Sequence, residues 1–142
     1  MKKLLITTLL FAGAYSIASA QSAKFNPDSS ITYQQSHFKK GDTVQLFYGS
    51  GADKDFKFIQ IINLKNFMNH PDMLAIYSKD KFVIDYVFLK DGKCTIRGKA
   101  PFTDDADDLV VVDVEGAIDN KEIVAPNNIS AIAKKPTFKK HR

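Results

Sequence analysis

The Asp91-Gly92 pair constrains the fold more than any other feature of this sequence. It lies between two runs, 82–89 and 93–99, that are rich in β-branched and aromatic residues. Asp-Gly favours a two-residue type I′ turn, because both central residues of that turn need a positive φ. The sequence therefore predicts a β-hairpin over residues 82–99.

Two earlier runs also read as strands. Residues 43–48 alternate between two faces with the period of a half-buried strand. Residues 56–62 resume the pattern, with one side made of Phe56, Phe58, Gln60 and Ile62. Seven residues, with two glycines among them, separate the two runs, so we expect the runs to pair as a second hairpin with a longer loop.

The remaining elements complete a mainly β fold. We expect a short strand over 73–77 and a strand buried on both faces over 109–112, followed by a helix of one or two turns capped by Asp113. Residues 123–124 and 129–132 could close the sheet. This pattern predicts a small antiparallel β-barrel of the SH3-like or OB-like kind with one short helix, and a sandwich-like roll is the alternative.

The N-terminus has the three parts of a cleavable signal peptide. Lys2 and Lys3 precede the apolar run 4–14, and Ala18-Ser19-Ala20 is a small-x-small cleavage site before Gln21. The apolar run is short for a membrane anchor, which needs about 20 residues. We therefore expect residues 1–20 to be removed and the protein to be exported to the periplasm, the outer-membrane surface or the medium.

The expected mature chain has three parts: an extended lead-in with one short strand (21–39), a single β-barrel domain (40–133) and a basic disordered tail (134–142). The chain has 20 basic residues. Two of these precede residue 21 and five lie in the tail, so segment 21–133 has 13 basic and 16 acidic residues and a net charge of −3. An acidic body argues against nucleic-acid binding, whereas the tail could contact acidic lipid headgroups at a membrane surface.

Two stretches resemble a group of small exported bacterial proteins. The first runs from Lys40-Gly41-Asp42-Thr43 through Gly49-Ser50-Gly51 to residues 56–59, and the second covers 112–123. The group has no established activity. The resemblance therefore supports the expected domain limits and implies no chemistry.

The acidic run 104–108 is the one local cluster with metal-binding chemistry. Its carboxylates could supply hard oxygen ligands to Ca²⁺, and the candidate ligands are Asp104, Asp105, Asp107 and Asp108. The run lacks the glycine and the bidentate glutamate of an EF-hand loop, and like-charge runs are usually solvated loops. Apart from this Ca²⁺ candidate, the sequence predicts no cofactor.

Other site motifs are absent from the sequence. Gly49-x-Gly51 leads into a strand without a third glycine, which is typical of a loop and not of a dinucleotide site. The histidines, His37, His70 and His141, are scattered, and Cys94 lies in an apparent strand where burial is expected. We find no nucleophile elbow, zinc-protease motif or phosphate-binding loop, so the sequence predicts no catalytic residue.

These features favour a non-catalytic binding or assembly module that docks on another protein of the cell envelope. Two strands, 43–48 and 82–89, are apolar on both faces, so one face of each could be a contact surface. One alternative is a hydrolase of envelope polymers whose carboxylates meet only in three dimensions. The other is a Ca²⁺-dependent ligand-binding domain.

The export signal gives the first testable prediction. We expect the exported protein to begin at Gln21, because the small-x-small site ends at Ala20. The intact mass of the exported protein, measured by mass spectrometry, should then equal that of residues 21–142. A mass that includes residues 4–14 would instead indicate an uncleaved anchor.

Overall fold

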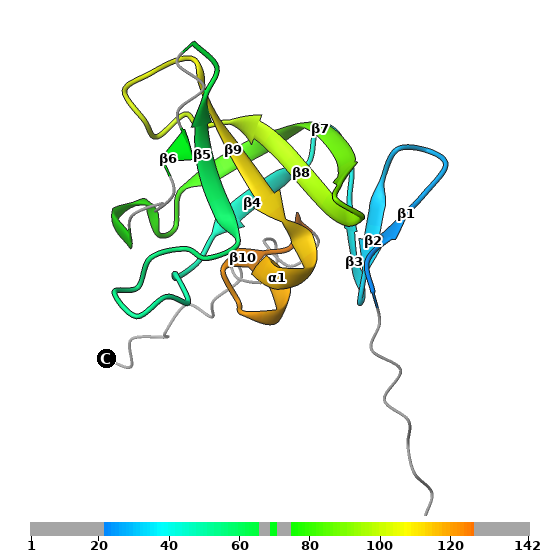
Figure 1. The fold of residues 1–142 in the computed structure, drawn as a ribbon. Helices are drawn as coiled ribbons and strands as arrows, with labels where there is room; N and C mark the ends of the chain where they lie inside the picture. The colour runs from blue at the N-terminus through cyan, green and yellow to red at the C-terminus, as the bar shows by residue number, and fades with distance from the viewer. Residues whose placement is uncertain (1–21, 66–68, 71–74, 127–142) are drawn as a thin grey trace, which may run out of the picture.

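A computed structural model describes residues 22–65, 69–70 and 75–126 of the chain, with side chains at all of these except 69 and 70. The expected signal peptide, the basic tail and residues 129–132 lie outside the described residues. Ten strands, one short α-helix and one 3-10 turn occur in the described part (Figure 1).

The strands form two antiparallel sheets. The smaller sheet has the order β1-β2-β3, made of Lys24–Phe25, Ile31–Tyr33 and Ser36–Phe38. The larger sheet has the order β10-β4-β7-β8-β9-β5-β6. Its strands are β4 (Thr43–Leu46), β5 (Ile59–Asn63), β6 (Asn69–His70), β7 (Lys81–Lys90), β8 (Lys93–Lys99), β9 (Asp108–Asp113) and β10 (Ile123–Val124).

The larger sheet curls into a half-barrel, and α1 (Val114–Asp119) follows β9 directly and lies against β8, β9 and β10 (Figure 1). The mainly β, antiparallel character with one short helix is confirmed. Within the described residues the edge strands β10 and β6 do not pair with each other, so the structure shows a half-barrel and not the closed barrel expected from the sequence.

The central hairpin is confirmed. β7 pairs with β8 from Ile84↔Gly98 to Lys90↔Lys93, and Asp91 and Gly92 connect them with φ values of 52° and 78°. Both turn residues therefore have the positive φ that a type I′ turn requires.

The segment from β9 to α1 also follows the prediction. Residues 109–112 are buried on both faces of β9, and the Asp113 side chain accepts a hydrogen bond from the Gly116 amide as the helix N-cap. Burial of Cys94, at 3% exposure in β8, is confirmed as well.

The predicted hairpin between 43–48 and 56–62 is wrong. β4 pairs with β7 and β10, whereas β5 pairs with β9 and β6. The strand also begins at Ile59, and its buried side is Ile59, Ile61 and Asn63, not the side that includes Gln60 and Ile62. A shift of one residue exchanges the two faces of a strand, and Phe56 is buried in the loop before β5 instead of within it.

Two other segments differ from the sequence-based expectation. Ala75–Tyr77 forms a 3-10 turn where a strand was predicted, and 73–74 lie outside the described residues. The segment predicted to hold one short strand, 21–39, carries three. Its Ile31 and Phe38 have no exposed surface and belong to the same core as β4, β7 and β9.

The type I′ turn gives a stability prediction. Gly92→Val should lower the free energy of unfolding by about 1 kcal/mol or more, because a β-branched residue resists positive φ. A side chain at this position would meet no atom within 4 Å, so the loss is conformational. Gly92→Asn is the control and should be tolerated, because asparagine adopts the left-handed region readily. Equal denaturation midpoints for both variants would contradict the turn assignment.

Candidate functional site

The acidic loop 104–108 is held by its own neighbours in the fold. The Asn63 side-chain amide donates to Asp105 Oδ2 and Asp108 Oδ1, each at 2.8 Å. The Asp107 backbone N–H donates to Asp105 Oδ1 at 2.9 Å, and this bond together with the Asn63 amide lowers the pKa of Asp105. Lys65 forms an ion pair with Asp107. Three of the four candidate ligands thus have partners within the chain, and Asp104 is exposed.

The structure therefore brings Asp105 and Asp108 together around one amide and directs Asp107 to a lysine. Among the residues whose side chains are described, no group of three or more histidine, cysteine or acidic side chains is arranged to hold a metal ion. The Ca²⁺ assignment stays a prediction of the sequence.

The Gly49–Gly51 segment opens a loop that folds back on itself. The Gly51 amide donates to the Asp55 carbonyl at 2.8 Å, and the Lys54 amide donates to the Gly51 carbonyl at 3.1 Å. A Cβ atom at Gly49 would lie 1.9 Å from the Lys54 carbonyl oxygen. Glycine is therefore required at position 49 by the close approach of the backbone, as expected for a loop.

A buried carboxylate, Glu122, fixes this loop to the domain. Its side chain has no exposed surface and accepts hydrogen bonds on Oε1 from the Ser50 amide (3.1 Å), the Ser50 hydroxyl and the Lys57 amide (2.8 Å). Its Oε2 accepts from the Phe58 amide at 2.9 Å. Sequence reasoning missed Glu122, because nothing around it in the sequence connects it to a loop more than sixty residues earlier.

The two histidines in the described residues and the cysteine lie apart from one another in the sequence and in the fold. His37 is exposed on β3 and His70 lies on β6, whereas Cys94 is buried on β8. Burial raises the pKa of the Cys94 thiol, and the nearby Glu115 and Asp113 carboxylates add to this effect. A raised pKa keeps the thiol protonated and unreactive. His141 lies outside the described residues.

The end of β7 carries exposed apolar and aromatic side chains, with Tyr86 and Phe88 on its outward face and Leu89 on the opposite face, which it shares with Val87. Tyr86 and Leu89 are each 54% exposed, and the rings of Tyr86 and Phe88 stack with centroids 5.6 Å apart. The Arg97 guanidinium lies 5.2 Å from the Tyr86 centroid. We call Tyr86, Phe88, Leu89 and Arg97 the β7 strip.

A β-bulge in β7 turns Tyr86 and Phe88 outward. Ile84 pairs with Gly98 and Tyr86 pairs with the next residue, Arg97, so Asp85 is an extra residue in β7. The Asp85 carboxylate accepts a hydrogen bond from Arg97 Nε at 3.1 Å. The bulge thus also supplies the acid that orients the arginine over the tyrosine.

The strip borders a hollow of about 420 Å³. Its other side is formed by Phe25, Ser29 and Lys40, which come from the first strand, the turn after it and the segment before β4. The strip is therefore not flat: its aromatic side chains line one wall of a depression.

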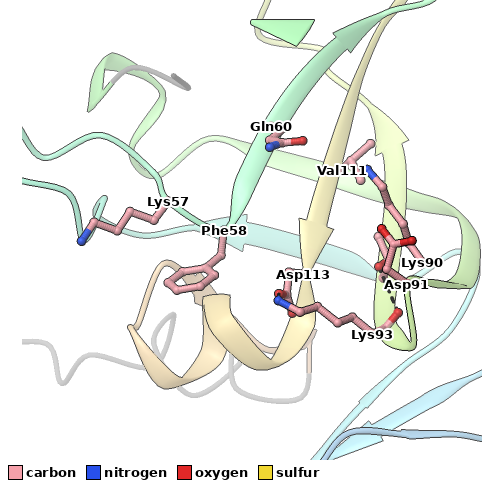
Figure 2. Close-up of a pocket in the computed structure, with 9 residues that line it drawn as sticks. Lys57, Phe58, Gln60, Lys90, Asp91, Lys93, Val111 and Asp113 are labelled. Atoms are coloured by element: carbon pink, nitrogen blue, oxygen red, sulfur yellow. Dashed lines mark hydrogen bonds and ion pairs between the residues drawn. The ribbon is translucent and has the colours of Figure 1, made fainter. Parts of the chain in front are cut away.

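A second hollow, of about 350 Å³, lies on the outward face of β5, β8 and β9 (Figure 2). Thr95 and Val111 line it, Gln60 lies at its β5 side, and Phe58 and the Lys90–Lys93 turn stand on opposite sides. Lys93 Nζ donates to Asp113 Oδ2 at 2.9 Å, and this bond raises the pKa of Lys93. We call this depression the outer hollow.

Comparison of the chain with protein-family models, with curated proteins and with solved structures gives no match. In the described residues, no helix is both long enough and apolar enough to cross a bilayer.

The Glu122 site gives a second stability prediction. Glu122→Gln should lower the free energy of unfolding by about 2 kcal/mol or more, because a charged acceptor is lost from a buried site. The new amide nitrogen must also face a backbone N–H, since both carboxylate oxygens accept from one. Chemical denaturation measures the change.

Two further variants serve as comparisons for the loss of stability expected of Glu122→Gln. Ser50→Ala removes only the hydroxyl donor and should cost about 1 kcal/mol, and Asp53→Asn, in the exposed part of the same loop, should be neutral. If Glu122→Gln were as stable as Asp53→Asn, the carboxylate would not be the anchor of the loop.

Proposed function

We propose that this protein is an exported, non-catalytic binding module that docks on another protein of the cell envelope through the β7 strip. The observation that carries the proposal is the exposure of Tyr86 and Leu89 beside Phe88 on one strand. Exposed apolar area costs roughly 25 cal/mol per Å² relative to burial. Contiguous exposed apolar surface on a soluble domain therefore marks a contact site.

The composition and order of the strip support a protein partner. Tyrosine and arginine are enriched among the residues that dominate binding energy at protein interfaces. The Tyr86 ring contacts both the Phe88 ring and the Arg97 guanidinium, and Asp85 holds Arg97 in turn. Little side-chain entropy remains to be lost on binding, so the strip is pre-organised for contact.

The neighbouring hollow gives the strip a shape that a partner can fill. Interface energy concentrates where an anchor side chain enters a desolvated pocket. The 420 Å³ depression between the β7 strip and Phe25 could receive such an anchor. On the same grounds we propose that the half-barrel belongs with the small SH3-like or OB-like barrels, in which loops and strand faces serve as binding surfaces.

Affinity capture tests the docking surface. The tagged mature protein is incubated with a membrane-envelope extract of its own cells, and the retained proteins are quantified. The Tyr86→Ser and Phe88→Ser double variant should lose the partner that the unmodified protein retains. Ile76→Ser is the matched control, because Ile76 is 73% exposed in the 3-10 turn, away from the strip.

The outcomes separate clearly. A partner retained by Ile76→Ser and lost by the double variant supports the β7 strip, provided that both variants keep the melting midpoint of the unmodified protein. A partner retained equally by all three proteins would place the contact elsewhere. Failure of the unmodified protein to retain any partner would contradict the proposed function.

A further inference from the structure

We propose that the outer hollow is a binding site for a neutral, hydroxyl-rich ligand of the glycan class. The site borders the β7 strip, because Thr95 pairs with Phe88 and Val111 pairs with Arg97, but its lining is different and the inference does not rest on the docking function. Its volume of about 350 Å³ lies at the lower end of the roughly 300–1,000 Å³ found for small-molecule sites. It would therefore hold a short stretch of a glycan, with the remainder of the chain in solvent.

The floor of the hollow is recessed although it is on the outward face of the sheet. Val110 and Val112 have no exposed surface and belong to the core, so Val111 between them points outward. Even so, Val111 is only 8% exposed, and Thr95 is 3% exposed. On a flat outer face, outward-pointing side chains would be exposed to water. The low exposure of Val111 and Thr95 therefore means that neighbouring side chains project beyond them and form the walls of the hollow.

One side of the hollow is an aromatic ring held in place by the core. The Phe58 amide donates to the buried Glu122 carboxylate, and the Phe58 ring packs over Gly116 so closely that a Cβ atom there would lie 2.0 Å from ring carbon Cδ1. Phe58 is only partly buried, and it lines the hollow. A fixed aromatic surface can pack against the apolar C–H face of a sugar ring.

The opposite side carries charges of alternating sign that cancel. Lys90, Asp91 and Lys93 come from the hairpin turn, and Asp113 accepts from Lys93 (Figure 2). Lys57 also borders the hollow, but its ammonium group points away from it in Figure 2. Two ammonium groups and two carboxylates thus face the hollow with no net charge.

This arrangement favours hydroxyl groups over a charged ligand. A charged ligand would meet as much repulsion as attraction on this side. A sugar hydroxyl can donate to a carboxylate and accept from an ammonium group at the same time, and the Gln60 amide offers one more donor and acceptor. The type I′ turn fixes the backbone that carries Lys90, Asp91 and Lys93, and the bond to Asp113 holds the Lys93 ammonium group, so this donor is placed before the ligand arrives.

Titration followed by NMR tests the site. The ¹⁵N-labelled mature protein is titrated with three neutral probes, cellotetraose, maltotetraose and N-acetylated chitotetraose. At least one probe should cause saturable shifts of the backbone amides of Gln60, Thr95 and Val111 at millimolar concentration. Asp91→Asn should weaken that binding by about three- to tenfold, the loss expected for one hydrogen bond.

The variants are chosen so that a change in affinity does not come from a loss of folded structure. Asparagine suits the left-handed φ of position 91, so Asp91→Asn preserves the turn while removing a charged acceptor. Gln60→Ala is a second variant, on another strand, and should weaken binding to a similar extent. Asp53→Asn makes the same chemical change on the exposed loop 52–54 and should leave the affinity unchanged.

Three results would overturn the inference. The first is an absence of shifts at these amides with all three probes. The second is equal affinity of Asp91→Asn, Gln60→Ala and the unmodified protein for the probe that binds. The third is tighter binding at the same amides by an anionic oligogalacturonate or by a tetra-alanine peptide, which would assign the hollow to an acidic or a peptide ligand.

Discussion

The Glu122 carboxylate is the interaction on which the arrangement of this half-barrel depends. It joins the start of β10 to a loop more than sixty residues earlier, through three backbone amides and one hydroxyl. The Glu122 backbone takes part as well, because its carbonyl accepts from the Phe47 amide at 2.7 Å and its amide donates to the Ala117 carbonyl at 2.7 Å. One residue therefore ties together the end of β4, the end of α1 and the approach to β5.

The Lys57 and Phe58 amides precede β5, so no strand partner satisfies them, and leaving such donors buried and unpaired would cost about 1–3 kcal/mol each. A carboxylate with two acceptor oxygens can satisfy all four donors, which an apolar side chain of similar size could not do.

The same residue connects stability to the outer hollow. Phe58, which forms one side of the hollow, is held by the Glu122 carboxylate through its amide and by Gly116 through its ring. Gly116 lies in α1, whose N-cap Asp113 accepts from Lys93 on the far side of the hollow. The two opposite sides of the hollow are thus joined through one short helix and its cap. Segments 40–59 and 112–123 also meet here, through the Phe58–Glu122 hydrogen bond and the Phe58–Gly116 contact, although sequence motifs alone gave no reason to expect contact between them.

The parts of the fold that the sequence predicts are those with local signals. Asp91-Gly92 determines its hairpin within a few residues, and Asp113 caps the helix that follows it directly. The pairing of β5 with β9 depends on residues about fifty positions apart. Local patterns carry no signal for such a pairing, and they favour instead a hairpin between the neighbouring runs 43–48 and 56–62. The glycines at 49 and 51 marked a loop correctly but did not show that Glu122 holds it.

The outer hollow was not predictable for the same reason: Phe58, Asp91 and Asp113 come together only when the register of β5, β8 and β9 is known. Apolar residues on both faces of 82–89 predict a contact surface, and in the fold Tyr86 and Leu89 of this run are exposed; their contact with a partner stays a prediction.

The β-bulge at Asp85 explains why that surface lies on β7. Phe82 and Ile84 face the core, so a strand of regular alternation would bury Tyr86 and expose Val87. The extra residue reverses this order: Val87 is 6% exposed and Tyr86 is 54% exposed. Gly98 permits the irregularity, because a Cβ atom there would lie 2.1 Å from the Val83 carbonyl oxygen and 2.7 Å from the Phe82 ring. Bulges commonly redirect a side chain next to a functional site. Here the inserted residue, Asp85, turns Tyr86 outward and also provides the carboxylate that holds Arg97. One backbone irregularity therefore both exposes the tyrosine and restrains the arginine beside it.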